Sequence, residues 1–307
     1  MVKLTRPEGS DARDLHLSRR MVGGVFFAGY AAFALGANAE PIHTDEAGLV
    51  TGVVQLPAAD RTIPAYLARP DARGRAPVVL VVSEVFGIHE YIRDLCRRLA
   101  KAGYVAIAPD FFARYGDPAP LTDYAEIRKI VGQATEAQVL GDIDAAMSWL
   151  KGQPFADVKK AAITGFCWGG AVVWQACALT KHFDAGVAWY GRLARPADDR
   201  DPAKHFPLEL AGQLKAPVLG LYGGRDKGIP LSDVSAMTEA LAKAGKSGSD
   251  IIVYTQSEHG FHADYRPSYD QVAARDGWRR MLAFIAENGV RPRSGVELRA
   301  PHLIGVG

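Results

Sequence analysis

The chain is poor in cysteine, in net charge and in long apolar runs. Three cysteines, Cys96, Cys167 and Cys177, occur in 307 residues, and no two form a Cys-x-x-Cys pair. Three cysteines cannot build a disulfide framework, and no His, Cys or Glu cluster has metal-ligand spacing. The 36 Lys and Arg nearly balance the 34 Asp and Glu, which leaves a formal net charge of +2. This balance argues against nucleic acid or an anionic membrane surface as a partner.

The amino-terminal segment differs from the rest of the chain. Arg19 and Arg20 precede an apolar run, residues 21–35, which is shorter than the roughly 20 residues of a membrane-spanning helix. Small residues follow at positions 37–39. This order resembles a twin-arginine export signal cleaved after Ala39, although Val22 and Gly23 stand where Phe and Leu are usual.

Residues 1–39 are therefore predicted to be an export signal. The protein would then be periplasmic or secreted and, after cleavage, not stably associated with a membrane. An uncleaved membrane anchor, or a disordered extension from a misassigned start codon, would be the alternative. A leader that does not function would leave the protein in the cytoplasm.

The remaining chain is predicted to form one α/β domain, residues 40–290, with a tail at 291–307, because no linker composition interrupts it. Segments 48–56 and 62–68 read as an antiparallel edge pair of strands. Strands of the buried type then alternate with helices. The strands are expected at 77–82, 104–108, 159–164, 185–190, 217–222 and 250–255. The helices are expected at 91–102, 121–131, 135–151, 168–180, 232–244 and 269–287, and Ser232 is expected to cap one of them. Such alternation predicts a mostly parallel central sheet with helices on both faces, whose ligands lie beyond the carboxyl ends of the strands.

A tight turn carries the strongest functional signal. Residues 165–170 read Gly-Phe-Cys-Trp-Gly-Gly and follow an apolar run directly. A Gly-x-nucleophile-x-Gly turn between strand and helix exposes the nucleophile, and its glycines are needed because a Cβ there would meet the neighbouring strand or helix. The helix that begins at Trp168 adds a positive N-terminal end, which favours thiolate. Cys167 is therefore the predicted nucleophile, with a buried structural thiol as the alternative.

A cysteine nucleophile needs a base held in the right tautomer by a carboxylate. In the α/β-hydrolase fold the order along the chain is nucleophile, acid, base. Asp226 follows the strand expected at 217–222, and His259 follows the one at 250–255, so both fit this order. Asp226 could instead be a turn residue, with Asp233 as the acid, and His262 competes with His259. No phosphate-loop pattern occurs, and we expect no cofactor and no metal.

Five motifs together resemble the dienelactone hydrolase (carboxymethylenebutenolidase) family. One of them begins at Glu84, directly after a buried strand, where a carboxylate would face the same sheet edge unless it is merely an exposed loop acid. The resemblance covers roughly residues 48–288, and its motifs lie at 84–87, 109–114, 165–170, 226–230 and 259–261.

The resemblance implies an α/β-hydrolase fold and hydrolysis of a small lactone or ester through an acyl-enzyme. It gives Cys167, His259 and Asp226 the roles of nucleophile, base and acid. Glu84 would keep the resting thiol neutral and take its proton once substrate displaces it. The backbone N–H groups of Val85 and Trp168 would form the oxyanion hole.

The family resemblance also implies that arginines bind the substrate carboxylate. Arg114 matches one such position. The second family arginine lies four residues after the histidine, where this chain has Ala263, and the nearest arginine is Arg266. A monomer acting on a small molecule is expected. A general carboxylesterase or thioesterase of the same family is the first alternative, and a non-catalytic ligand-binding or thiol-sensing protein is the second.

Overall fold

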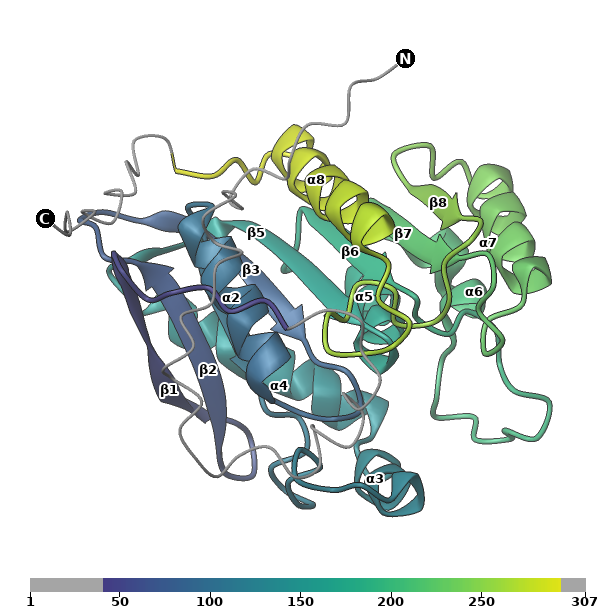
Figure 1. The fold of residues 1–307 in the computed structure, drawn as a ribbon, viewed down its shortest axis with the longest axis horizontal. Helices are drawn as coiled ribbons and strands as arrows, with labels where there is room; N and C mark the ends of the chain where they lie inside the picture. The colour runs from purple at the N-terminus through teal and green to yellow at the C-terminus, as the bar shows by residue number, and fades with distance from the viewer. Residues whose placement is uncertain (1–40, 294–307) are drawn as a thin grey trace, which may run out of the picture.

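The structure is a computed structural model that describes residues 41–293. The predicted export signal, residues 1–39, and most of the predicted tail lie outside the described residues. The described chain forms one eight-stranded sheet in the order β1-β2-β4-β3-β5-β6-β7-β8 (Figure 1). The strands are β1 (Leu49–Pro57), β2 (Thr62–Pro70), β3 (Ala76–Val82), β4 (Val105–Pro109), β5 (Ala156–Phe166), β6 (Ala185–Trp189), β7 (Val218–Gly223) and β8 (Asp250–Tyr254).

Strand direction follows the prediction. β1 pairs antiparallel with β2, and β2 pairs antiparallel with β4. The other neighbours, from β4 across to β8, all pair in parallel. The antiparallel edge pair and the mostly parallel sheet are both confirmed.

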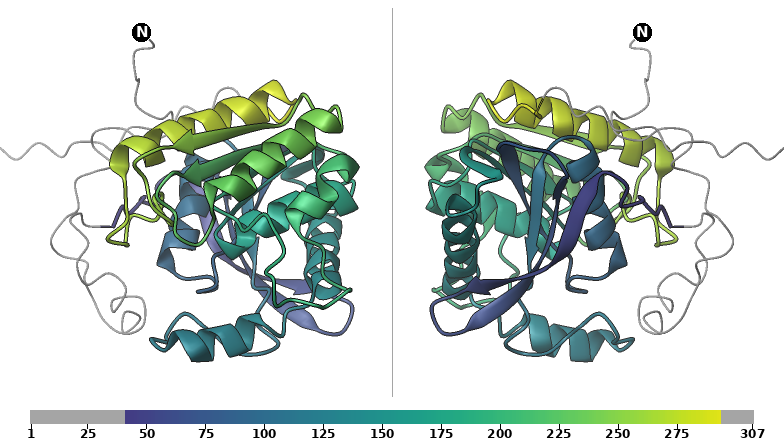
Figure 2. Two further views of the ribbon diagram at one scale, coloured as in Figure 1. Left: turned by 90° about the vertical axis from the view of Figure 1, so that its right-hand side faces the viewer. Right: turned by 90° about the vertical axis from the view of Figure 1, so that its left-hand side faces the viewer.

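Helices cover both faces of the sheet. α2 (Glu90–Lys101) and α8 (Gln271–Glu287) lie on one face, and α4 (Glu136–Lys151) and α5 (Trp168–Leu179) lie on the other (Figures 1 and 2). This double cover explains β3, whose seven residues are all buried, because a strand with no solvent-facing side reads as a continuous apolar run. The remaining helical elements are α3 (Tyr124–Val131), α6 (Pro207–Leu210), the short 3₁₀ helix η1 (Ala211–Gln213) and α7 (Leu231–Lys243).

Several helix starts differ from the sequence prediction, among them that of α3, which begins at Tyr124 rather than at 121. α7 begins at Leu231, and the carbonyl of Pro230 accepts its first bonds, so Ser232 lies inside the first turn and is not the cap. α8 begins at Gln271 rather than at 269, because the Asp270 carboxylate accepts hydrogen bonds from the N–H groups of Val272 and Ala273, both at 3.1 Å. Within residues 41–293, no helix is long and apolar enough to cross a membrane.

Candidate active site

The candidate nucleophile occupies a strained turn between β5 and α5. Cys167 has φ 54° and ψ −115°, a backbone conformation that non-glycine residues rarely adopt. Its N–H donates to the carbonyl of Trp189 (3.0 Å), and its own carbonyl accepts from the N–H of Gly170 (3.0 Å). Hydrogen bonds to β6 and to α5 therefore stabilise this strained conformation, which places the thiol beyond the end of β5 at the start of α5.

The glycines around Cys167 have no room for a side chain. A Cβ on Gly165 would lie 2.3 Å from the carbonyl oxygen of Gly169, and one on Gly170 would lie 2.5 Å from that of Trp189. A Cβ on Gly169 would lie 2.5 Å from the carbonyl oxygen of Val82 at the end of β3. Because the atoms that each Cβ would meet belong to the backbone and cannot move aside, the turn packs tightly between the ends of β3 and β6.

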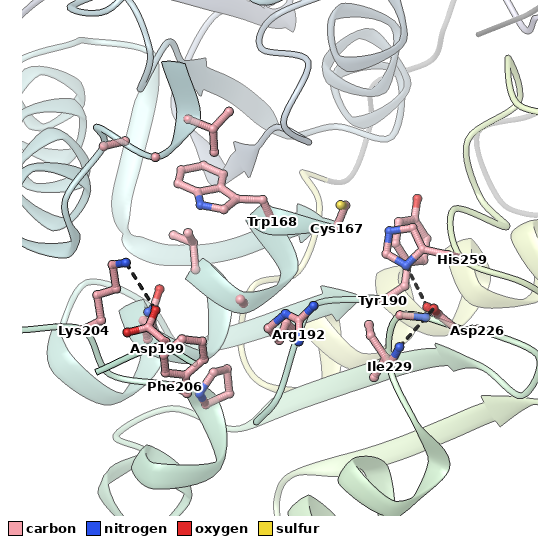
Figure 3. A pocket seen from close by; sticks show the side chains of 18 of the residues that line it. Cys167, Trp168, Tyr190, Arg192, Asp199, Lys204, Phe206, Asp226, Ile229 and His259 are labelled. Carbon is pink, nitrogen blue, oxygen red and sulfur yellow. Dashed lines mark hydrogen bonds and ion pairs between the residues drawn. The ribbon is translucent and has the colours of Figure 1, made fainter. Parts of the chain in front are cut away.

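An imidazole and a carboxylate from the next two loops face this turn. His259 follows β8, and its Nδ1 donates to Oδ2 of Asp226, which follows β7, over 2.7 Å (Figure 3). The other carboxylate oxygen of Asp226 accepts from the N–H groups of Gly228 (2.8 Å) and Ile229 (3.2 Å). Asp226 is thus both oriented by its own loop and bound to the imidazole.

The protonation of His259 reflects both neighbours. Burial lowers its pKa, but the hydrogen bonds to Asp226 and to Cys167, with the negative charges of both, outweigh burial and raise the pKa to about 10. The structure therefore brings Cys167, His259 and Asp226 together, as the sequence predicts, with His259 between the other two.

His262, the alternative to His259 as the base, does not lie at the turn. His262 is buried, its Nδ1 is hydrogen-bonded to the hydroxyl of Tyr91 (2.7 Å), and its ring lies 4.4 Å from that of Trp189. Burial, and to a lesser extent the charge of Arg98, holds the pKa of His262 well below its usual range. Its position inside the core leaves His259 as the imidazole at the turn. The competing acid, Asp233, lies in the first turn of α7.

Glu84 is a fully buried carboxylate, so the reading as an exposed loop acid is wrong. Its Oε2 accepts from the hydroxyl of Tyr265 (2.7 Å) and lies 3.6 Å from Nε2 of His89, and its Oε1 lies 3.7 Å from a guanidinium nitrogen of Arg266. Burial raises its pKa, but the bond to His89 and the charge of Arg266 outweigh burial and lower it. The exchange of a proton between Glu84 and Cys167 stays a prediction.

Arg114 does not lie where the sequence analysis places it. Its guanidinium binds Asp60 through Nε (3.0 Å) and Asp142 through both terminal nitrogens (2.8 Å each). It does not line the pocket beside Cys167, whereas Arg266 does. The expected role of Arg114 in binding a substrate carboxylate is therefore corrected: two carboxylates of this chain already occupy its donors.

Cys167 opens into a pocket of about 760 Å³. Besides the predicted residues Cys167, Trp168, Asp226, His259 and Arg266, this pocket is lined by residues that no motif indicates. Among them Tyr190 directly follows β6 with φ 39°, and Arg192, Lys204 and Phe206 belong to the loop between β6 and α6 (Figure 3). The pair Tyr190-Gly191, directly after β6, was the one sequence signal that could have placed part of this loop at the site. Over residues 41–293, no group of three or more His, Cys, Asp or Glu side chains is arranged to hold a metal ion.

Comparisons with known proteins agree with this arrangement. A sequence profile described as the dienelactone hydrolase family matches residues 63–289. A protein of Methylorubrum extorquens named "Putative carboxymethylenebutenolidase" is 47% identical over 277 residues, which cover 89% of this chain and 94% of that protein. A Bradyrhizobium protein named "Probable 2-oxo-3-(5-oxofuran-2-ylidene)propanoate lactonase" is 32% identical over 222 residues, which cover 72% of this chain and 88% of that one.

A solved structure shares the fold over nearly its whole length. The crystal structure of a "Putative Dienelactone Hydrolase" from Klebsiella pneumoniae has a TM-score of 0.74 and 44% identity, and the match covers 78% of this chain and 99% of that one. Sheet order, strained turn and structural likeness together define an enzyme with the α/β-hydrolase fold. The chain belongs to the dienelactone hydrolase family and is a hydrolase of the carboxymethylenebutenolidase type.

Proposed function

We propose that this hydrolase opens a lactone or ester by a Cys167–His259–Asp226 triad, through an acyl-enzyme on Cys167. One observation carries the proposal: a strained turn presents the thiol to an imidazole whose other nitrogen is bound to a buried carboxylate. This is the arrangement that nucleophilic acyl transfer requires. The lactonase name of the Bradyrhizobium relative supports the same reaction class.

The first half-reaction acylates the enzyme. Nδ1 of His259 donates to Asp226, so Nε2 is the atom that takes the Cys167 proton. The thiolate sulfur attacks the carbonyl carbon, and the electron pair of the C=O bond moves to oxygen, where the N–H groups of Trp168 and Val85 donate to it. When the oxyanion collapses, the C–O bond breaks and the leaving alkoxide takes the proton from Nε2. A lactone leaves its alcohol tethered to the acyl group.

The second half-reaction releases the acid. Nε2 of His259 takes a proton from water, and the resulting hydroxide attacks the thioester carbon. Collapse breaks the C–S bond, and the leaving sulfur takes the proton from Nε2, which restores the neutral thiol and imidazole. In the resting enzyme, the buried Glu84 is proposed to keep the Cys167 thiol neutral until substrate displaces it.

The proposal is tested with the full chain and two substitutions of the nucleophile. We expect Cys167→Ala to lower kcat/KM for 4-nitrophenyl acetate by at least about 10³-fold, because triad removal leaves only binding and oxyanion stabilisation. Cys167→Ser is expected to lose most activity too, because a serine hydroxyl is harder to deprotonate at this turn. Cys96→Ala is the matched control, since that thiol is buried in α2 outside the pocket.

Intact-mass measurement during turnover adds a direct readout. A mass increase equal to the acyl group, absent in Cys167→Ala, supports the acyl-enzyme. Full activity in Cys167→Ala contradicts the proposal. Sulfenate formation on Cys167 without any acyl adduct would favour the thiol-sensing alternative, and turnover of simple aryl esters but not of dienelactone would favour the general esterase.

A further inference from the structure

The pocket extends beyond Cys167 into a region that the triad does not use, here called the distal lobe. Its walls come from the end of α3, the start of α4, the first turns of α5 and the loop before α6. The side chains that define it are Val131, Ala134, Val139, Trp168, Val172 and Phe206. These walls are apolar or aromatic, and a pocket of about 760 Å³ is far larger than a small lactone needs.

Several polar side chains of the distal lobe are paired with one another. Glu136 binds the ring Nδ1 of His205 at 2.7 Å and the backbone N–H of the same residue at 2.9 Å. Its second oxygen also accepts from the amide of Gln175 (3.2 Å). Lys204 is paired with Asp199 at 3.3 Å (Figure 3). An apolar group could therefore fill the lobe without leaving a buried charge unpartnered.

The indole of Trp168 forms a fixed wall of the lobe. Its ring lies 4.9 Å from that of Phe112 and 6.0 Å from that of Phe111, both in the loop after β4. Three aromatic rings in contact restrict the indole to one orientation. A substrate group would therefore meet a rigid apolar surface directly beside the nucleophile.

The position of His259 decides which part of an ester can reach the lobe. The leaving oxygen must face the imidazole that protonates it. Figure 3 shows His259 on one side of Cys167 and Trp168, Lys204 and Phe206 on the other. The leaving group therefore lies toward His259, and the acyl part lies toward the distal lobe.

The carboxylate anchors implied by the family resemblance are missing from this pocket. Arg114 is occupied by Asp60 and Asp142, and Ala263 stands buried at the second arginine position. Arg266 lines the pocket but lies 3.7 Å from the buried Glu84. Arg192, Arg225 and Lys227 are cations that could still receive a carboxylate, since they line the pocket and are exposed.

Resting on the proposed function, we propose that the distal lobe binds an uncharged, apolar acyl group of an ester or lactone. The substrate class is then a neutral ester with a medium-length alkyl or an aryl acyl part, rather than a small lactone that carries a carboxylate. Val131 and Phe206, which both line the lobe, determine the acceptable acyl size.

A matched series of 4-nitrophenyl esters tests this with the full chain. Each buried methylene contributes enough for a roughly fourfold gain, so kcat/KM is expected to rise by about 10² from acetate to hexanoate. The carboxylate-ended analogue of the hexanoate, the mono-4-nitrophenyl ester of adipic acid, is expected to react at least tenfold more slowly than the hexanoate.

Two variants connect the preference to the lobe. Val131→Trp fills the space, and Phe206→Ala removes one wall; each is expected to lower the hexanoate-to-acetate ratio of kcat/KM at least fivefold. Val131 is only half-buried at the end of α3, so a bulkier side chain can be accommodated there. Val53→Trp is the matched control, because Val53 is 58% exposed on β1, and its ratio should equal that of the wild type.

Several outcomes would overturn the inference. One is a flat profile from acetate to hexanoate. Another is a rise that survives Val131→Trp in protein with a wild-type melting curve. A third is faster turnover of the adipate monoester than of the hexanoate. Failure of the proposed function is separate, because it appears as acetate hydrolysis that persists in Cys167→Ala.

Discussion

The turn at Cys167 and the distal lobe share one pocket but are built in different ways. At the turn, backbone atoms from β3, β6 and α5 approach so closely that Gly165, Gly169 and Gly170 exclude any side chain. At the lobe, the walls are side chains, several of them half-buried, from segments far apart in the sequence. The difference indicates that the position of Cys167, the proposed nucleophile, is held by the main chain, whereas the shape of the proposed acyl site can change through single side chains.

The largest effect is expected at the turn from a change of one atom in the triad. Asp226→Asn keeps the side-chain shape but no longer favours the His259 tautomer with its proton on Nδ1. We expect kcat to fall by about 10³–10⁴-fold, as in other enzymes in which a carboxylate orients the catalytic histidine. Asp233→Asn is the control. Steady-state kinetics in which Asp233→Asn, and not Asp226→Asn, is inactive would reassign the acid.

A change outside both regions should affect stability and leave catalysis intact. Arg114→Gln leaves Asp142, whose side chain is 2% exposed, as a buried carboxylate without its cation. We expect a loss of about 3 kcal/mol in the free energy of unfolding, measured by urea titration. The kcat/KM of the folded variant should stay within about twofold of wild type.

Two further variants identify the cause of that loss. The double variant Arg114→Gln/Asp142→Asn should recover part of the stability, because the unpartnered charge is removed. Arg61→Gln, which breaks an exposed pair with Asp60, should cost under about 0.5 kcal/mol. A large loss of activity without loss of stability in Arg114→Gln would restore the substrate-binding role to this residue.

A glycine next to the turn tests the claim of main-chain packing. A Cβ on Gly191 would lie 2.3 Å from the backbone nitrogen of Ala171 in α5, so Gly191→Ala should destabilise the protein by about 1–3 kcal/mol. Gly141→Ala is the matched control, because a Cβ there meets nothing within 4 Å on the exposed side of α4. That variant should be stabilised by roughly 0.5–1 kcal/mol. Equal thermal-melt shifts for the two would contradict the packing argument.

The smallest effect is expected at the loop behind Trp168, where pH is the variable. Burial, with lesser contributions from the charges of Asp117 and Asp142, raises the pKa of Asp110 to about 6. Its carboxylate accepts from the N–H of Phe112 (3.0 Å), so it helps to hold the ring that backs the indole.

The sign follows from the raised pKa of Asp110. The folded state keeps the proton longer than the unfolded state, so this contribution to stability is complete below about pH 4 and is lost as pH rises through about 6. Relative to Asp110→Asn, the wild type should lose on the order of 1 kcal/mol across this range. Parallel urea titrations at pH 4 and pH 7 measure the difference, and a constant difference between the two proteins would contradict the prediction.

Sequence reasoning placed residues correctly where their position depends on neighbours in the chain and on strand order. The pattern around Cys167 indicates a turn because its glycines meet backbone atoms that any strand-turn-helix unit of this kind brings close. The order of Asp226 and His259 after successive strands was sufficient to place both near Cys167, because parallel strands bring their carboxyl ends to one edge of the sheet. Sequence reasoning failed for Arg114, whose partners Asp60 and Asp142 lie 54 and 28 residues away.

The sequence by itself determined the class of fold, the turn that carries Cys167 and the family, because those depend on local steric patterns and on strand order. Only the tertiary structure decided which charges cancel and which surfaces meet. Whether Arg114 binds a substrate or Asp142, and whether Val131 and Phe206 face one cavity, depends on distances between segments that no local pattern encodes. The acyl group that the proposed site accepts therefore depends on the assembled pocket, since the walls of the pocket belong to no single motif.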